Sequence, residues 1–268
     1  MKISPTLSSI HIFPVKSLDG ISLIKAEISA GGCLLHDREF VMADENGKFI
    51  NGKANPLVHS LRSTVDFENE TISLRHHAES GWNTFHLLRE KVELQNYLSD
   101  FFGFRTFLHQ DKTGRFLDIP DTSGVTLIST ASLNAVSEWY QQMPLDETRK
   151  RFRATLEIEG VPAFWEDHLF SHDQRIEFQI GDVKMYGMSP RARCVVPTRH
   201  PETGEVIHGF PKIFSRQREL TLPGWSKLSD YGHYYHLSVD CSIPATEIGK
   251  SIELGDSVVI ISPSALSC

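Results

Sequence analysis

Alternating apolar and polar residues dominate the first part of the chain and predict short β-strands. Residues 10–15 (IHIFPV) and 21–29 (ISLIKAEIS) switch between the two classes at almost every position, as strands with one buried face do. Residues 38–51 contain Asn46-Gly47 between two strand-like runs, a typical signal of a hairpin turn. The same pattern predicts further strands at residues 64–76, 84–88, 91–95, 175–188 and 250–262.

Helical patterns are scarcer. The clearest covers residues 129–143, where hydroxyl side chains precede a segment with apolar residues on one face. A second predicted helix lies within residues 96–103 and ends at Gly103, and a third covers residues 211–220. Together the patterns predict a mainly β fold with a few helices, built as a β-barrel or as strongly bent sheets.

A polar, turn-rich segment at residues 109–124 separates two structured regions. Such segments are typical of domain boundaries, so we predict one β-rich domain over residues 1–112 and a second over residues 113–268. The alternative is that the segment is a functional loop, because Thr122 and Ser123 offer hydroxyl groups there.

The composition is that of an ordinary globular protein, with 40% hydrophobic and 23% charged residues. The formal net charge of −7 argues against a general attraction to nucleic acid or anionic membranes, although a local basic pocket would stand out against it. No stretch reaches the ~20 apolar residues of a membrane span, and the N-terminus lacks the apolar segment of a signal peptide. We therefore expect a cytoplasmic protein that binds neither nucleic acid nor membrane.

Cysteine usage points to a reducing compartment, because the spacing predicts neither a disulfide framework nor a CxxC metal site. The four cysteines are Cys33, Cys194, Cys241 and Cys268. Cys194 stands out because Arg191 and Arg193 precede it. Nearby guanidinium groups lower the pKa of a thiol and favour the thiolate, which is both a nucleophile and a metal ligand. The alternative, which the local sequence by itself favours, is an inert buried cysteine.

Three basic residues, Lys16, Arg38 and Arg153, each lie at the edge of a predicted strand. Considered singly, each is most simply a solvated surface side chain. If they converge in the fold, they form an anion pocket suited to phosphate, because guanidinium groups bind phosphate oxygens in pairs. Hydroxyls such as those of Thr122 and Ser123 would complete such a pocket.

Histidines number 13, but they do not predict a metal site. His168 and His172 form one close pair and His233 and His236 another, yet neither pair has an evident third ligand nearby. Both are interpreted as solvated or hydrogen-bonded histidines. The sequence also lacks GxGxxG, Walker, GxSxG and HExxH motifs, so nucleotide hydrolysis and α/β-hydrolase chemistry have no support.

Several stretches in a fixed order resemble one family. They are FPVKSLDG (13–20), LHDREFVMADENGKFI (35–50), DTSGVTLISTASL (121–133), RFRATLEIEGVPAFWEDHL (151–169), RARCVVPTRHPETGE (191–205) and IELGDSVVII (252–261). Together they resemble the two-part MOSC proteins, which include the mitochondrial amidoxime-reducing component and bacterial reductases of N-hydroxylated purines. The resemblance implies a β-barrel MOSC fold, with a β-barrel-like N-terminal domain before the MOSC domain.

The resemblance also implies a molybdenum cofactor, in which a pyranopterin dithiolene with a phosphate tail carries the metal. Cys194 matches the family's cysteine and would ligate molybdenum through its thiolate. A soft thiolate suits this metal, and cationic neighbours would keep the sulfur deprotonated. The implied cofactor contacts are Lys16, Arg38, Asp121, Thr122, Ser123, Arg153, Thr155 and Arg193.

The chain departs from the family pattern near two of these residues. Residues 152–155 read FRAT where relatives have FRPN, so the Thr155 hydroxyl replaces a longer amide. Ala192 stands where the family has a hydroxyl near the cofactor, and Arg191 is expected to compensate with its charge.

These features predict a monomeric oxidoreductase that removes oxygen from small N-hydroxylated or N-oxide substrates. Some bacterial relatives append a [2Fe–2S] domain, but the cysteine spacing here cannot bind such a cluster. Electrons are therefore expected from a separate flavoprotein or ferredoxin-like protein. Two alternatives stay open: a carrier of sulfur or of the cofactor that uses Cys194 as its sulfur-carrying thiol, and a β scaffold that has lost the cofactor.

Overall fold

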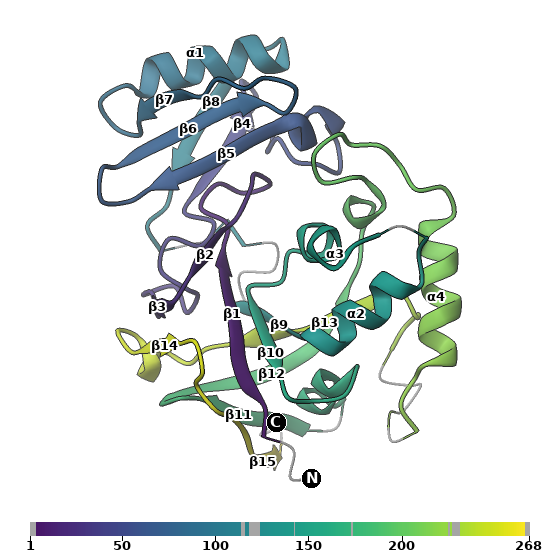
Figure 1. Cartoon of the computed structure of the whole chain (residues 1–268). Helices are drawn as coiled ribbons and strands as arrows, with labels where there is room; N and C mark the ends of the chain where they lie inside the picture. Colours follow the sequence, from purple (N-terminus) through teal and green to yellow (C-terminus); the bar gives the residue numbers. More distant parts are fainter. Residues whose placement is uncertain are drawn as a thin grey trace.

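A computed structural model describes residues 4–113, 116–117, 124–141, 143–172, 174–224, 226 and 231–265, and Figure 1 shows their arrangement. The strands are β1 (Thr6–Ile12), β2 (Ile21–Leu23), β3 (Lys25–Glu27), β4 (Phe40–Asp44), β5 (Leu61–Asp66), β6 (Thr71–His76), β7 (Asn83–His86), β8 (Thr106–Gln110), β9 (Val125–Ser129), β10 (Leu156–Glu159), β11 (Gln174–Ile180), β12 (Val183–Ala192), β13 (His236–Ser242), β14 (Ser251–Glu253) and β15 (Val258–Ala265). The helices are α1 (Lys91–Phe102), α2 (Thr130–Glu138), α3 (Leu145–Phe152) and α4 (Phe210–Leu220), and the short 3₁₀ helices are η1 (Pro56–Ser60), η2 (Trp165–Leu169), η3 (Val196–Thr198) and η5 (Ala245–Glu247). The prediction of a mainly β fold with a few helices is confirmed.

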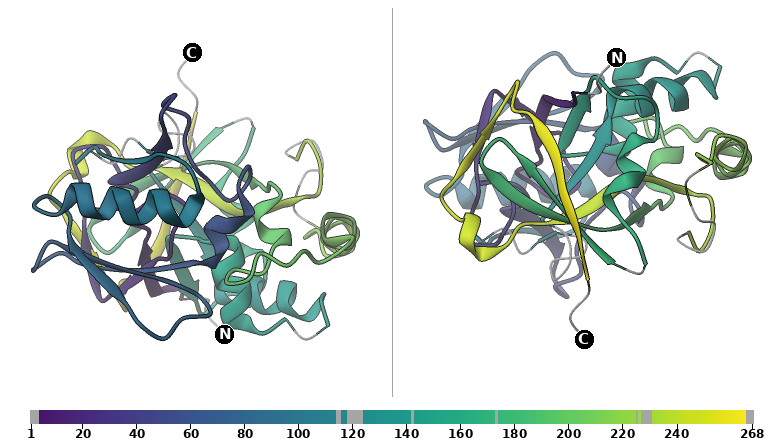
Figure 2. Two further views of the ribbon diagram at one scale, coloured as in Figure 1. Left: turned by 90° about the horizontal axis from the view of Figure 1, so that it is seen from above. Right: turned by 90° about the horizontal axis from the view of Figure 1, so that it is seen from below.

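One sheet of eight strands forms the centre of the molecule, in the order β15-β11-β12-β13-β9-β10-β1-β2. Adjacent strands of this sheet run antiparallel, except that β9 and β10 run parallel to each other. In Figure 2, the view from below shows β15, in yellow, along the edge of this sheet. The sheet bends until its outer parts meet, since Thr6 of β1 bridges Ser257 just before β15. Among the described strands, no sheet closes into a complete barrel.

A smaller group of strands packs against α1 at the top of the molecule as drawn in Figure 1, far from the marked N-terminus. β4 pairs with β8, and β5, β6 and β7 form an antiparallel sheet. Leu94, Leu98 and Phe102 of α1 are buried at intervals of four residues, so one face of the helix enters the core. These side chains belong to one hydrophobic cluster with Met42 of β4 and Leu108 of β8.

Helix α1 begins earlier than the sequence pattern predicts. Residues 91–95, predicted as a strand, form its first turns, so that prediction is wrong. Apolar residues at two of five positions fit a helical face as well as a strand, because so short a run does not separate the two periods. The predicted end is confirmed: Gly103 has a φ of 76°, and its N–H donates to the Ser99 carbonyl at 2.8 Å, the usual glycine helix end.

The remaining helices agree with the sequence pattern to different degrees. α4 lies where a helix is predicted, and α2 begins as predicted, with Ser129 Oγ accepting a hydrogen bond from the Ser132 N–H at 3.1 Å. α2 ends at Glu138, short of the predicted residue 143. α3 is absent from the predictions because its sequence, LDETRKRF, is mostly charged and buries few side chains.

Strands from both predicted domains contribute to the central sheet. β1 and β2 precede residue 112, whereas β9 to β13 and β15 follow it, and β3 pairs with β14 across the same division. The hydrophobic core of the sheet likewise joins Ile10 to Ile158 and Val239. The boundary near residue 112 stays a prediction, and the first strand of the chain is built into the larger sheet.

A buried carboxyl group lies in η2, which packs against β12 and β13. Glu166 is 1% exposed. Burial, reinforced by the negative charge of the adjacent Asp167, raises the pKa of Glu166 to about 7. Ionising this group inside the protein costs free energy that a solvated glutamate does not incur.

We predict that Glu166→Gln stabilises the protein more at alkaline than at acidic pH. The folded carboxyl keeps its proton until about pH 7, whereas an unfolded glutamate ionises near a pKa of about 4.3. The wild-type protein therefore loses stability as the pH rises between these values, and the uncharged variant does not. Urea unfolding near pH 5 and near pH 8 should show the gain in free energy of unfolding growing by ~2–3 kcal/mol.

The matched control for this prediction is Glu159→Gln, because Glu159 is exposed at the end of β10. Its effect on the free energy of unfolding should be the same at both pH values. An equally pH-independent effect of Glu166→Gln would show that the buried carboxyl is not protonated in the folded protein.

Candidate functional site

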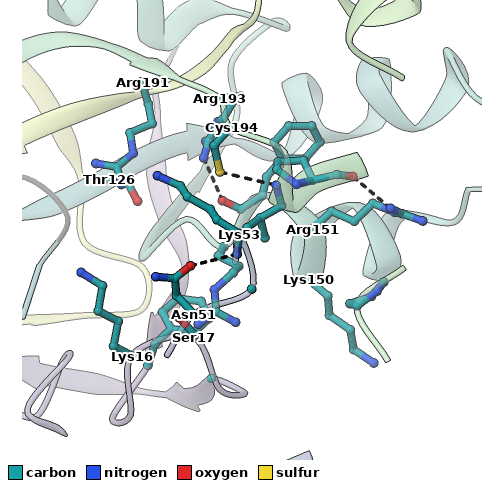
Figure 3. Close-up of a pocket in the computed structure, with 18 of the residues that line it drawn as sticks. Lys16, Ser17, Asn51, Lys53, Thr126, Lys150, Arg151, Arg191, Arg193 and Cys194 are labelled. Carbon is teal, nitrogen blue, oxygen red and sulfur yellow. Dashed lines mark hydrogen bonds between the residues drawn. The ribbon is translucent and has the colours of Figure 1, made fainter. Parts of the chain in front are cut away.

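A pocket of about 520 Å³ lies between the central sheet and the smaller group of strands that packs against α1. The loops after β1 and β4, together with η1 and β5, line one side. The end of α3, the end of β12 and the segment around η3 line the other, and Figure 3 shows the side chains that extend into it. Sites for cofactors and small ligands commonly have volumes in this range.

Cations dominate the lining of the pocket. Among the described residues, ten Lys and Arg side chains line it, against the two carboxylates of Asp19 and Asp240, in a chain whose formal net charge is −7. The ten are Lys16, Arg38, Lys53, Arg62, Lys150, Arg151, Arg153, Arg191, Arg193 and Arg199. Positive charge concentrated in a concave site attracts anionic ligands.

Four of the predicted cofactor contacts meet at this pocket, together with the predicted metal ligand. Lys16, Arg38, Arg153 and Arg193 line it with Cys194, although nearly 180 positions separate the first from the last. The convergence on which the anion-pocket hypothesis depends is therefore present in the fold. The role of each residue toward a cofactor stays a prediction.

Arg38 and Arg153 are positioned by the same aromatic ring. Their guanidinium carbons lie 4.5 and 4.0 Å from the ring centroid of Phe13, within the range of cation–π attraction. Arg38 also pairs with the buried Asp37 at 2.5 Å, and Asp37 accepts the Phe13 N–H at 2.8 Å. Both arginines have left-handed backbones, with φ of 51° and 52°, a conformation that is costly outside glycine and recurs at functional sites.

Cys194 is half-buried at the pocket, whereas Cys33 and Cys241 are buried. Its Sγ accepts a hydrogen bond from the Val196 N–H at 3.5 Å, which fixes the position of the sulfur. Its carbonyl oxygen accepts a hydrogen bond from the Tyr235 hydroxyl at 3.2 Å. Of the described cysteines, Cys194 is the one that a ligand can reach, which argues against the inert buried thiol.

The two arginines before Cys194 have different partners. Arg191 pairs with Asp240 at 2.8 Å. Arg193 donates to the carbonyl oxygens of Phe152 at 3.1 Å and Leu237 at 2.6 Å. Burial, together with the charge of Arg191, lowers the pKa of Arg193 to about 10, so it keeps its charge at neutral pH. Arg193 thus ties the segment that carries the thiol to α3 and β13.

Thr155 does not line the large pocket. Its hydroxyl donates to the Thr126 carbonyl oxygen at 3.0 Å and accepts the Thr126 N–H at 2.7 Å, so it links the starts of β9 and β10. Thr126 itself lines the pocket, and its hydrogen bonds with Thr155 hold it in position. Asp121, Thr122 and Ser123 lie outside the described residues, and their contacts to a cofactor stay predictions.

Several pocket residues were not marked by any local pattern. They are Phe13, Lys53, His59, Arg62, Lys150, Arg151 and Arg199. Phe13, Arg151 and Arg199 lie within the family-like stretches FPVKSLDG, RFRATLEIEGVPAFWEDHL and RARCVVPTRHPETGE, which was the available signal. The others come from segments with no such signal, and only tertiary structure brings them together.

The described residues show how the two histidine pairs are placed. No group of three His, Cys, Asp or Glu side chains that could hold a metal ion occurs within the described ranges. The rings of His233 and His236 stack with centroids 4.1 Å apart, and His236 Nδ1 donates to the His233 carbonyl oxygen at 2.5 Å.

Among the described helices, none combines the length and apolar character needed to cross a membrane.

Two family models match the chain in succession. The MOSC N-terminal beta barrel domain matches residues 4–118, and the MOSC domain matches residues 115–259, more than half of the chain. The fold and the site therefore define a class of protein: it has a mainly β fold that two family models match in succession, and a pocket lined by cations. The chain belongs to the MOSC domain family.

Three curated relatives show what the chain is similar to. The mitochondrial amidoxime reducing component 2 of Bos taurus is 26% identical over 300 residues, which cover 94% of this chain and 82% of the relative. The mitochondrial amidoxime-reducing component 1 of Homo sapiens is 22% identical, covering 96% and 83%. The molybdenum cofactor sulfurase of Bos taurus is 21% identical over 90% of this chain, which spans 31% of the sulfurase.

We predict that inorganic phosphate binds the pocket and raises the thermal unfolding temperature. Arg153→Met should raise the half-saturating phosphate concentration at least about tenfold, because a hydrogen bond to a charged group contributes ~1.5–3 kcal/mol. The measurement is the unfolding temperature as a function of phosphate concentration, with sodium chloride at matched ionic strength. Arg89→Met, at an exposed position outside the pocket, should not change the response. Equal weakening in both variants would contradict the assignment.

Proposed function

We propose that this protein binds a molybdenum cofactor in the cation-lined pocket and reduces small N-hydroxylated or N-oxide compounds. The observation that carries the proposal is the position of Cys194, whose accessible thiol lies at a pocket lined by ten Lys and Arg residues. The similarity to amidoxime-reducing components and to a molybdenum cofactor sulfurase supports both parts of the proposal.

The residues present fit such a cofactor. A terminal phosphate carries a charge of about −1.5 to −2 at neutral pH, and Lys16, Arg38 and Arg153 offer matching positive charge at the pocket. Arg193 lies next to the thiol, and its buried Nε has no hydrogen-bond partner among the described residues. A thiolate is the soft ligand that a sulfur-ligated metal accepts.

The chemistry of the reaction would belong to the cofactor. When bound, it would supply the two electrons that, with two protons, convert an N-hydroxylated compound into the N–H compound and water. The protein's own part is to hold and orient. The Val196 N–H fixes the sulfur of Cys194, and the Tyr235 hydroxyl fixes its carbonyl oxygen. Ligand-bearing residues held in this way need little reorganisation on binding.

Electrons would arrive from a separate protein, a flavoprotein or a ferredoxin-like protein. The sequence has four scattered cysteines, and their spacing does not suit the cysteine-rich segments that hold iron–sulfur clusters. The donor would approach the side of the molecule on which the pocket opens.

A second candidate function is favoured by the similarity to the molybdenum cofactor sulfurase. Under this alternative, Cys194 carries sulfur transiently as a persulfide, and the same pocket holds the cofactor as cargo. The half-buried position of the thiol suits this chemistry too, because sulfur transfer requires an accessible thiolate.

We predict that Cys194→Ser loses bound molybdenum and at least about a hundredfold in the rate of benzamidoxime reduction, because a hydroxyl is a far poorer ligand than a thiolate for a soft site. The metal is measured by elemental analysis of protein expressed in a host that makes the cofactor, and turnover is measured with a chemical reductant. The free energy of unfolding should stay close to that of the wild type.

The control is Cys33→Ala, because Cys33 is buried and does not line the pocket. It should retain metal and turnover. Full metal content and turnover in Cys194→Ser would contradict the reductase proposal, whereas a persulfide on Cys194 in metal-free wild-type protein would favour the carrier.

A further inference from the structure

We infer that the pocket has a second anion subsite and that the substrate carries a carboxylate or phosphate group that binds there. This inference rests on the proposed function and adds a substrate class to it. The second anion subsite consists of Lys53, Arg62 and Arg199, together with His59, all of which line the pocket. None of the four is among the residues matched to the cofactor.

Internal carboxylates neutralise some of the pocket cations but not all of them. Arg191 pairs with Asp240 at 2.8 Å, Arg151 with Glu147 at 2.6 Å and Lys150 with Glu202 at 2.7 Å. Within the described part of the chain, neither Lys53 nor Arg199 forms an ion pair with a carboxylate. Two positive charges therefore remain at this end of the pocket beyond those assigned to the cofactor phosphate.

Buried donors in the second anion subsite also lack acceptors. Arg62 is 8% exposed. The Nε atoms of Arg62 and Arg199 are buried, and neither has a hydrogen-bond partner among the described residues. An unsatisfied buried donor costs about 1–3 kcal/mol, so the fold holds these two guanidinium groups at the pocket at the expense of stability.

His59 lines the same pocket as these cations, and Arg62 Nη2 donates to its carbonyl oxygen at 2.8 Å. Burial, together with the positive charges of Arg199, Arg153 and Arg62, lowers the pKa of His59 to about 4, so His59 is uncharged at neutral pH and adds a polar ring without repulsion. Arg153 belongs to the cofactor group, and the two anion positions are therefore neighbours. A substrate bound at one would reach toward the other.

Lys53 completes the subsite from the loop after β4. A β-carbon at Gly52 would lie 2.8 Å from His59 Nε2, so the absence of a side chain lets this loop pack directly against His59. Asn51 Oδ1 accepts the Lys53 N–H at 3.0 Å. Figure 3 shows the Lys53 side chain extending across the pocket toward Cys194, whereas Lys150 and Arg151 point away from the sulfur.

The opposite wall of the subsite is fixed by contacts between the two parts of the chain. Arg62 Nη2 donates to the Pro201 carbonyl oxygen at 3.0 Å, and Arg62 Nη1 pairs with Asp19 at 3.1 Å. Arg199 is thus held on a segment anchored from the N-terminal strands. A subsite formed before the ligand arrives binds without a large ordering cost.

The test compares two substrates that differ by one charge, benzamidoxime and 4-carboxybenzamidoxime. Wild-type protein should show kcat/KM at least about tenfold higher for the carboxylate, as expected for one added charge-assisted contact. Arg199→Met should reduce this ratio to about one. Arg216→Met, at an exposed position on α4 outside the pocket, should keep it. An unchanged ratio in Arg199→Met would overturn the inference.

A binding measurement separates the subsite from the proposed function. The probe is 4-carboxybenzamidine, which has no N–OH group to reduce, titrated by calorimetry into the protein as purified. Arg199→Met should weaken its binding at least about tenfold, and Arg216→Met should not. If this result holds while no reduction occurs, the proposed function fails and the subsite stands. If Arg199→Met instead lowers the amount of bound pterin, the position belongs to the cofactor and the inference fails.

Discussion

Ten like charges around one cavity repel one another, and the rest of the site depends on how the fold keeps them there. Carboxylates provide part of the answer: the buried Asp37 pairs with Arg38, and Asp240, which lines the pocket, pairs with Arg191. The backbone carbonyl oxygens of Phe152 and Leu237 hold Arg193. Charges in a partly dry site are tolerated only when such partners compensate them. These contacts compensate part of the positive charge at the pocket.

The path of the first strand explains why the pocket forms at all. β1 lies between β10 and β2 in the central sheet. The loop between β1 and β2 leaves this sheet, bridges Phe40 of β4 at Val15, and returns to it at β2. That loop carries Phe13 and Lys16 into the pocket. Arg153, at the end of α3, directly precedes β10, the partner of β1. Sheet pairing thus places Phe13 and Arg153 side by side, and the cation–π contact between them follows from the topology.

The sequence pattern predicted the class of fold but not the path of the chain. Period-two alternation identified many strands, and Gly103 marked the end of α1 correctly. The alternation was misleading at residues 91–95, because so short a segment fits both the strand period and the helix period. The pattern also missed α3, because the charged sequence of this helix has no apolar face. Such local patterns carry no information about which strands pair, because pairing depends on packing between distant segments.

The candidate site was predictable only where several stretches resembled a family. Lys16, Arg38 and Arg153 each look like solvated residues when considered alone, and nothing local shows that they share a pocket. Lys53 and Arg199 were missed because each looks like a solvated residue in the sequence, and only the folded chain brings both to the pocket. Thr155 was matched to the cofactor by the resemblance, but in the fold its hydroxyl forms hydrogen bonds with the backbone of Thr126 within the sheet.

The uneven distribution of charge has a consequence for how ligands arrive. The whole chain is negative although its pocket is strongly positive, so the remaining surface is more negative than the total suggests. An anion that approaches the molecule is repelled by the negative surface and attracted to the opening of the positive pocket. Because mobile ions shorten the reach of such fields to ~8 Å at physiological ionic strength, capture of charged molecules would slow with added salt, and capture of uncharged ones would not.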